Sequence, residues 1–332
     1  MKKNIAIVSG GDSGEFDISI QSGRVVEKFL DKSKYDVYQI ILKGTEWKHY
    51  CSHDNDYDID KNDFSLPMIA EKITFDCVFI AIHGTPGEDG KLQGYFDMMG
   101  IPYTGCDHIV SALTFNKHLC KQVVQNLGIK TARSQRVNVH SLPVPVEILN
   151  TLSLPLFVKP NNGGSSVGMS KVNRADELQA ALDKAFKEDD ELLVEEFIKG
   201  REITCGVLKH NNEVITLPVT EIVSKKEWFD YEAKYNSILA DEIVPAQIPE
   251  SIYKQCQEIS SDLYIKLNCR GIVRFDYIFN EHGIFFLEVN TVPGMTETSI
   301  VPKMAKSYGL PLEDLFGILV EEAIHSNITN KG

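Results

Sequence analysis

The chain of 332 residues lacks the features that mark several large protein classes. No apolar run approaches the roughly 18 to 20 residues of a membrane-spanning helix, and the opening residues lead into a strand pattern rather than a signal peptide. Positive charge is scarce, since 34 Lys and Arg face 47 Asp and Glu and give a formal net charge of -13. Nucleic acids and anionic membranes attract basic surfaces. We therefore expect no nucleic-acid partner, no membrane partner and a cytoplasmic location.

Cysteine and histidine are also few. The seven cysteines never stand as Cys-x-x-Cys, and the nine histidines show no paired ligand spacing. This excludes a disulfide framework and a zinc site, so we expect reduced cysteines that serve in packing. Two nucleotide signatures are missing as well. The turn GGDSGEFD lacks the G-x-G-x-x-G fingerprint, and in HGTPGEDGKLQG the residue Leu92 stands where a P-loop has Ser or Thr.

What is present is an α/β pattern. Apolar runs over 4–9, 35–42 and 75–83 predict strands, and helical spacing follows the first of them, so we expect a doubly wound parallel sheet in a domain over 1–112. The acidic segment 51–64 reads as a solvated excursion rather than a calcium loop, because it lacks the glycine and terminal Glu of an EF-hand. The glycine-rich loop after the third strand lies where such sheets bind ligands. His83, at that strand end, either faces the ligand crevice or is structural.

A second signal lies in the middle of the chain, after a predicted helix over 107–127 that carries Lys117. The segment LPLFVKPNNGGSSVGMSKV predicts a strand, a glycine turn and a strand. The turn over 163–168 offers backbone N–H groups and hydroxyls to a polyphosphate, with Lys159 on the strand beneath. The alternative is a flexible hairpin with a surface lysine. Further strands are predicted over 133–139, 192–198 and 203–208, and a helix over 174–187.

Acidic residues near apolar ones follow on these strands. Glu195 and Glu196 precede Phe197 and Ile198, and Glu202 opens the next strand. Such a set suits an adenine amino group and a ribose, although a solvated strand edge explains it equally well. A strand over 214–222 leads into the segment 224–246, which breaks all periodicity. Long irregular loops in compact domains are usually lids or binding loops.

The strongest signal is the hairpin predicted within Gly271 to Pro302. Arg274 and Asp276 are two residues apart on its first strand, and Glu288 and Asn290 on its second, so each pair points to one face. Two carboxylates and an amide are oxygen ligands that Mg²⁺ accepts together with nucleotide phosphates. A salt bridge of Arg274 with either carboxylate on a solvated face is the alternative. A helix over 249–267 precedes the hairpin, and helices over 299–309 and 312–324 end the chain.

These motifs together resemble the D-alanine–D-alanine ligase family of the ATP-grasp superfamily. The resemblance rests on IAIHGTPGEDGKLQG, LFVKPNNGGSSVGMSKV, FDYEAKY, GIVRFDYIF and FLEVNTVPGMTETSIVP, and it spans almost the whole chain. It implies three α/β domains, over 1–112, 113–193 and 194–332, with ATP between the second and third. The implied reaction joins two D-alanine molecules through an acyl phosphate, for peptidoglycan precursors. Two Mg²⁺ ions, with Mn²⁺ as a substitute, a monovalent cation and a homodimer are further implications.

The resemblance also assigns residues. It implies metal binding by Asp276, Glu288 and Asn290, and catalytic roles for Glu15, Ser165, Tyr235, Arg274 and the backbone N–H of Gly294. Substrate contacts fall to His83, Lys234, Ser299 and Ile300. ATP contacts fall to Lys117, Lys159, Gly164, Ser166, Glu195, Glu196, Phe197, Ile198, Glu202 and Phe229. The loop 228–240 and the hairpin loop 163–168 are expected to close over the site, and Ser165, Tyr235 and Glu15 to form one hydrogen-bonded set.

Two features stand apart from this assignment. Phe16 follows Glu15 where many relatives have a basic residue, and the preference for D over L substrates rests on the resemblance alone. Two other functions stay open on the residues. Another carboxylate–amine ligase would keep the metal and phosphate residues but lack FDYEAKY, and a non-catalytic nucleotide-binding protein would have no need of the three metal-binding side chains together.

Tyr235 generates a prediction about the second substrate, because depsipeptide-forming relatives carry histidine there. A phenol is neutral near about pH 7, whereas an imidazole is partly protonated and repels an ammonium. Tyr235→His should therefore shift the product from D-alanyl-D-alanine toward the ester with D-lactate as the pH falls. The measurement is a competition of D-alanine against D-lactate, with both products quantified between about pH 6 and 9. Mainly ester from the unmutated enzyme at neutral pH would contradict this interpretation of Tyr235.

Overall fold

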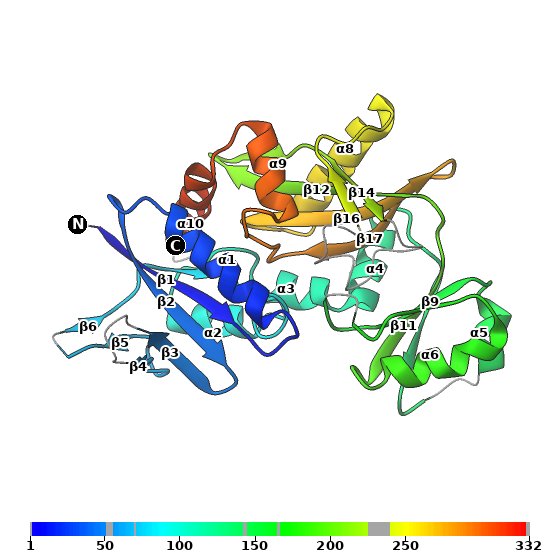
Figure 1. Cartoon of the computed structure of the whole chain (residues 1–332), viewed down its shortest axis with the longest axis horizontal. Helices are drawn as coiled ribbons and strands as arrows, with labels where there is room; N and C mark the ends of the chain where they lie inside the picture. The colour runs from blue at the N-terminus through cyan, green and yellow to red at the C-terminus, as the bar shows by residue number, and fades with distance from the viewer. Residues whose placement is uncertain are drawn as a thin grey trace.

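The structure is a computed structural model that describes residues 2–50, 56–69, 71–141, 145–164, 167–224 and 240–329. Its architecture is α/β, with three main sheets that follow one another along the chain and helices packed against them (Figure 1). Across these described ranges, no helix combines the length and apolar character needed to cross a membrane. The α/β class expected from the sequence is confirmed.

The N-terminal sheet has the strand order β4-β3-β2-β1-β7. Its strands are β1 (Lys3–Gly10), β2 (Tyr35–Lys43), β3 (Glu46–Tyr50), β4 (Asp56–Asp58) and β7 (Cys77–Ile80). The parallel prediction holds for β2, β1 and β7, while β3 and β4 extend the edge in antiparallel fashion. A small ladder pairs β5 (Leu66–Pro67) with β6 (Lys72–Ile73), and the helices are α1 (Phe16–Phe29) and α2 (Lys91–Met99).

The acidic segment is more than a solvated excursion, because its end is anchored in the core. Phe64 is 1% exposed and packs edge-on against Phe96, with ring centroids 4.8 Å apart. The nearby carboxylates bind local donors: Asp60 accepts the backbone N–H of Asn62 at 3.0 Å, and Asp63 accepts the Lys72 ammonium at 2.6 Å. Aromatic burial therefore fixes the described part of this segment.

The central sheet has the order β10-β9-β11-β8. Its strands are β8 (Ser134–Asn138), β9 (Leu156–Pro160), β10 (Ser170–Val172) and β11 (Glu191–Glu196), and its helices are α5 (Pro145–Thr151), the 3₁₀ turn η1 (Ala175–Glu177) and α6 (Leu178–Ala185). The predicted glycine-loop hairpin is confirmed, since β9 and β10 pair antiparallel. The predicted domain boundary at 193–194 falls within β11, all of which belongs to the central sheet. The domain limits stay a prediction.

The C-terminal sheet has the order β15-β14-β12-β16-β17, with β13 paired to β12. Its strands are β12 (Arg201–His210), β13 (Glu213–Thr216), β14 (Thr220–Ser224), β15 (Ala240–Ile243), β16 (Ile272–Asn280) and β17 (Gly283–Asn290), and the helices are α8 (Glu250–Lys266), α9 (Ile300–Tyr308) and α10 (Leu312–Thr329). The strand predicted over 214–222 is present but interrupted. β13 and β14 both pair antiparallel with β12, and the register slips by one residue between them, around Pro218, which has no N–H for a ladder.

The helix predicted over 107–127 is two helices, α3 (His108–Phe115) and α4 (Lys117–Asn126). Asn116 breaks them with φ -81° and ψ 101°, and its side chain caps α4 by accepting the backbone N–H of Leu119 at 3.0 Å. An asparagine favours such a cap because its side chain satisfies one of the N–H groups at the helix start. The break places Lys117 at the first position of α4.

The last helix returns to the beginning of the chain. Leu315 and Phe316 on α10 are fully buried in a cluster with Ile7 of β1 and Phe79 of β7. The ring centroids of Phe79 and Phe316 lie 5.8 Å apart. Figure 1 shows α10 beside α1 and the N-terminal sheet. The N-terminal and C-terminal sheets therefore share one hydrophobic cluster.

A polar latch joins the loop after β7 to the loop after β17. Glu88, 9% exposed, accepts the backbone N–H groups of Gly84 at 2.7 Å and Val292 at 3.2 Å. His83 Nδ1 lies 2.8 Å from the Val292 carbonyl, so this nitrogen donates, and Nε2 lies 3.1 Å from Ser22 Oγ. Burial lowers the pKa of His83, which favours the neutral ring.

The latch makes stability depend on pH, because burial raises the pKa of Glu88 to about 7 from an ordinary 4.5. Folding then favours the protonated carboxyl, so this contribution to the unfolding free energy is full below pH 4.5 and is lost as the pH rises toward 7, by about 3 kcal/mol. Glu88→Gln carries no titrating group here, so its stability lacks this pH dependence. Its amide nitrogen cannot accept one of the two N–H groups, but that loss is the same at every pH. The unfolding free energy of the variant minus that of the parent, from urea titrations, should rise by about 3 kcal/mol over this range.

The matched control is Glu71→Gln, which changes an exposed carboxylate and should leave that difference flat. A flat difference for Glu88→Gln as well would show that Glu88 ionises normally in the folded protein.

Candidate functional site

A cavity of about 620 Å³ lies where the three main sheets meet. That is the size range of small-molecule sites. Its walls come from the loop after β1, from β9 and the glycine loop, from β11 and β12, and from β14, β16 and β17. Of the residues predicted for the site, these line it: Glu15, Lys117, Lys159, Gly164, Glu195, Glu196, Phe197, Ile198, Glu202, Arg274, Asp276, Glu288 and Ile300.

The acidic hairpin forms one wall, and its convergence is confirmed. Asp276 lies opposite Glu288, and Arg274 opposite Asn290, across the β16–β17 ladder. Asp276 is 7% exposed and accepts Arg274 through both oxygens, at 2.9 Å and 2.8 Å. It also accepts Thr204 at 2.6 Å and the Asn290 amide at 3.0 Å. The salt bridge considered as the alternative therefore exists within the cluster, in a buried setting rather than on a solvated face.

The donor set of this wall fits a hard cation. Asp276 and Glu288 offer carboxylate oxygens and Asn290 one amide oxygen, and Mg²⁺ is usually held by one or two carboxylates together with water and phosphate oxygens. Within the part of the chain that the structure describes, no three His, Cys, Asp or Glu side chains could hold a metal by themselves. A cation here would thus need further ligands from a substrate, and Asn290 would turn its amide oxygen inward.

A buried charge cluster forms the opposite wall. The Glu195 carboxylate, 7% exposed, binds Lys121 Nζ at 2.8 Å through one oxygen and Lys159 Nζ through the other. Burial opposes ionisation of Glu195, but the two lysine charges outweigh it and lower its pKa to about 2. Lys117 Nζ lies 3.9 Å from the Glu288 carboxylate and donates to the carbonyl of Gly163. The ammonium groups of Lys117 and Lys159, which line the cavity, suit phosphate oxygens.

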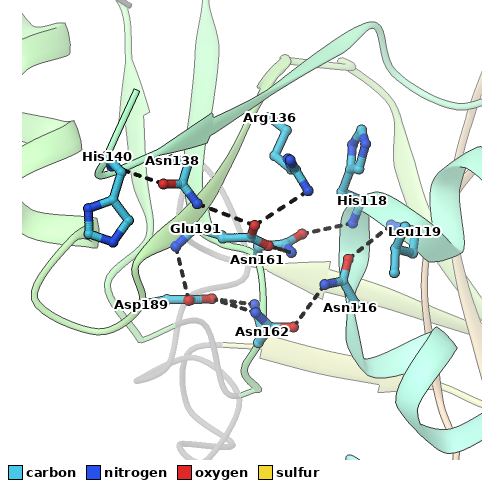
Figure 2. Close-up of polar contacts among 10 residues, drawn as sticks. All are labelled: Asn116, His118, Leu119, Arg136, Asn138, His140, Asn161, Asn162, Asp189 and Glu191. Atoms are coloured by element: carbon cyan, nitrogen blue, oxygen red, sulfur yellow. Dashed lines mark hydrogen bonds and ion pairs between the residues drawn. The ribbon is translucent and has the colours of Figure 1, made fainter. Parts of the chain in front are cut away.

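An asparagine network fixes the start of α4 against the end of β9 (Figure 2). Asn161, fully buried, accepts the backbone N–H of His118 at 2.8 Å and donates to Glu191 at 3.1 Å, while its backbone carbonyl accepts the N–H of Lys117 at 3.0 Å. Asn162 binds the Asn116 amide at 3.1 Å. The network therefore sets the distance between Lys117 and the glycine loop.

The loop after β1 supplies Glu15, whose position depends on two glycines. A Cβ on Gly164 would lie 3.1 Å from the Glu15 carboxylate, so the glycine loop runs directly past it. Gly10 has φ +96°, and a Cβ there would meet the Leu42 carbonyl at 2.4 Å, so only glycine allows this turn. The Phe16 ring packs against Gly10, and the Nζ of Lys43, on β2, lies 5.9 Å from the centroid of that ring.

The apolar end of the cavity lies at β11 and β12. Phe157 and Phe197 face each other with centroids 5.7 Å apart, and Lys171 Nζ lies 4.0 Å from the Phe197 centroid. Glu196 turns partly outward, accepting Arg133 at 3.2 Å and the backbone N–H of Ser153 at 2.9 Å. This slot of apolar side chains rimmed by carboxylates has the character of a base pocket, as the sequence suggested.

Four predicted residues do not line the cavity. Gly294 and Ser299 lie together, since a Cβ on Gly294 would be 2.9 Å from Ser299 Oγ, and Asn290 reaches the cavity through its bond to Asp276. His83 uses both ring nitrogens in the latch, which fits the structural alternative better than substrate contact. Five predicted residues lie outside the described residues: Ser165, Ser166, Phe229, Lys234 and Tyr235.

The sequence interpretation missed two contributors. Lys121 was available, because it follows Lys117 by four residues and therefore shares its face of the helix. Thr204 had no signal in its own segment, since its role depends on the register that sets it opposite Asp276.

Comparison with known proteins agrees with this geometry. A family model described as "D-ala D-ala ligase N-terminus" matches residues 4–106, and one described as "D-ala D-ala ligase C-terminus" matches residues 123–321. A D-alanine–D-alanine ligase of Phocaeicola vulgatus is 44% identical over 322 residues, covering 97% of this chain and 99% of the relative.

Solved structures show the same fold. A VanG D-Ala:D-Ser ligase from Enterococcus faecalis superposes with a TM-score of 0.85 at 34% identity, covering 97% of this chain and 100% of that one. A D-alanine–D-alanine ligase from Bacillus anthracis complexed with ATP gives 0.78 at 28% identity, covering 98% and 99%. The fold and the cavity thus define a ligase of the ATP-grasp type. The chain belongs to the D-alanine–D-alanine ligase family.

The asparagine network yields a stability prediction. Asn161→Ala leaves the His118 N–H and the Glu191 carboxylate without this partner, so the unfolding free energy should fall by about 2 to 4 kcal/mol. Asn138→Ala, in the same network, removes a 3.4 Å contact to Glu191 and the bond that Asn138 accepts at 2.9 Å from the backbone N–H of His140, which is exposed to water. Because solvent can replace that bond, the variant should cost only about 1 kcal/mol. Urea unfolding of both variants makes the measurement. Equal losses would contradict the central place given to Asn161.

Proposed function

We propose that the cavity binds ATP between the charged wall of β9 and β11 and the acidic hairpin, with the D-alanine sites toward Glu15 and Gly294. As a member of its family, the chain is a ligase that joins two D-alanine molecules at the expense of ATP, for peptidoglycan synthesis. The observation that carries the placement is the pairing of Asp276 with Glu288 on one cavity wall, facing the lysines of the other.

The roles follow from charge and position. Lys117 and Lys159 hold nucleotide phosphates, while Phe197, Ile198 and Glu202, with Glu195 and Glu196, surround the base and ribose. Glu15 attracts the ammonium of the first D-alanine, and Lys234 and Ser299 the carboxylate of the second. Ile300, at the start of α9, bounds this end of the cavity. Four residues are proposed from the sequence alone: catalytic roles for Ser165 and Tyr235, and ATP contacts for Ser166 and Phe229.

The chemistry matches these residue types. The carboxylate of the first D-alanine attacks the γ-phosphorus of ATP, which forms an acyl phosphate and releases ADP. The amine of the second D-alanine then attacks the acyl carbon and loses a proton, and inorganic phosphate leaves. Arg274 and the Gly294 N–H are placed as fixed donors to the developing oxyanion. Mg²⁺, or Mn²⁺, would be held by Asp276, Glu288 and Asn290 and would neutralise phosphate charge.

Some parts of the proposal concern the protein beyond this site. We propose a homodimer through the N-terminal domain, where Met98 on α2 and Ile109 on α3 are 80% and 64% exposed. We also propose that the protein binds a monovalent cation and is located in the cytoplasm. D-Serine is a competing second substrate, since the Enterococcus faecalis structure is named for it.

Phosphate release from ATP tests the function. It should require D-alanine, with D-alanyl-D-alanine as the product, and should not occur with L-alanine. If an equal mixture of D-alanine and D-serine gives mainly the mixed dipeptide, the second substrate is D-serine rather than D-alanine.

Glu288→Gln tests the hairpin. Losing one anionic ligand should lower kcat by about 10²-fold or more, roughly 3 kcal/mol, with the fold kept. Glu281→Gln, at the exposed turn of the same hairpin, is the control and should retain parental kcat. Steady-state kinetics at saturating Mg²⁺ decide, and parental turnover by Glu288→Gln would dispose of the metal assignment.

A further inference from the structure

Lys121 is a buried cation that the proposed reaction does not use. It lies on α4 one turn after Lys117, is 2% exposed and is not among the cavity-lining residues. Its ammonium binds Glu195 Oε2 at 2.8 Å, and Glu195 Oε1 binds Lys159. The carboxylate is therefore held between one lysine inside the protein and one at the cavity wall.

Such an arrangement is costly. Removing an ammonium from water costs several kcal/mol, and apolar side chains of similar size often replace buried ion pairs without loss of stability. Burial lowers the pKa of Lys121, in accord with that cost, and the Glu195 charge offsets part of it. A methionine would pack the same space, so packing alone does not explain this lysine.

The charge count supplies a reason. Lys159 and Glu195 alone form a neutral pair, in which the ammonium is drawn toward its own carboxylate. Lys121 adds a second cation behind that carboxylate, so the three side chains together carry one positive charge. At low exposure such charges act strongly on an anion entering the cavity, since little water screens them.

We propose that Lys121 is a positioning residue, which holds Glu195 from behind and so leaves the Lys159 ammonium at the cavity wall available to the nucleotide phosphates. This inference rests on the proposed function, in which Lys159 meets those phosphates. Lys121 itself touches neither nucleotide nor amino acid.

ADP with Mg²⁺ is the probe, and calorimetric binding to the full-length variants is the measurement. Lys121→Met should weaken ADP binding at least about tenfold. The separate variant Lys121→Arg, which keeps the charge, should bind ADP within about threefold of the parent. Lys121→Gln keeps a donor to Glu195 without the charge. It should bind ADP as weakly as Lys121→Met, and it replaces that variant should the methionine protein fail to fold.

A double-mutant cycle locates the effect. If Lys121 acts through Lys159, then Lys121→Met should change ADP affinity by less than about twofold in a Lys159→Met background. Lys3→Met is the matched control, because it removes another interelement ion pair, 3.1 Å from Glu321, far from the cavity. It should leave ADP affinity unchanged while lowering the thermal midpoint.

The outcomes separate cleanly. Parental ADP affinity in Lys121→Gln, an equal loss in both Lys159 backgrounds, or an equal loss in Lys3→Met would overturn the inference. Failure of the parent to bind ADP at all would overturn the proposed function instead. Reduced affinity that depends on Lys159 and returns with arginine supports the positioning role.

Discussion

The register of the β12–β16–β17 ladder is the constraint on which the site depends. It sets Thr204, Asp276 and Glu288 in one cross-strand row and places Arg274 beside Asn290 in the next. A carboxylate as buried as Asp276 needs several polar partners, and Arg274, Thr204 and Asn290 provide them. A shift of one residue would turn these side chains to the opposite face of the sheet. The register therefore fixes the acidic wall before any ligand arrives.

The opposite wall is built by a different principle. Lys121 on α4 and Lys159 on β9 hold Glu195 between them, and the asparagine network locks the two elements together (Figure 2). The network satisfies the first N–H groups of α4 with protein oxygens, which helix starts require. Positive and negative walls thus come from separate sheets. Their facing arrangement depends on the packing of α4 beneath β17 and of α10 on the N-terminal sheet.

Much of this could be predicted from the sequence. The hairpin residues, the glycine loop and the strands follow from periodicity and turn residues, and the family follows from motifs of low ambiguity. Local patterns failed where one residue overrides them, as Asn116 does within a helical pattern and Pro218 within a strand pattern. They also could not show partners distant in sequence. The bond from Lys121 to Glu195, the latch around Val292 and the return of α10 to β1 join segments that no periodicity connects.

The central claim is that the carboxylates of the hairpin bind, through a metal, the phosphates of a nucleotide in the cavity. The most direct measurement is a crystal structure with ADP and Mn²⁺, in which anomalous scattering locates the metal. The account predicts Mn²⁺ about 2.2 Å from oxygens of Glu288 and Asp276 or Asn290, with ADP phosphates completing its coordination. Mn²⁺ bound elsewhere, or ADP phosphates bound away from both this hairpin and Lys159, would contradict it.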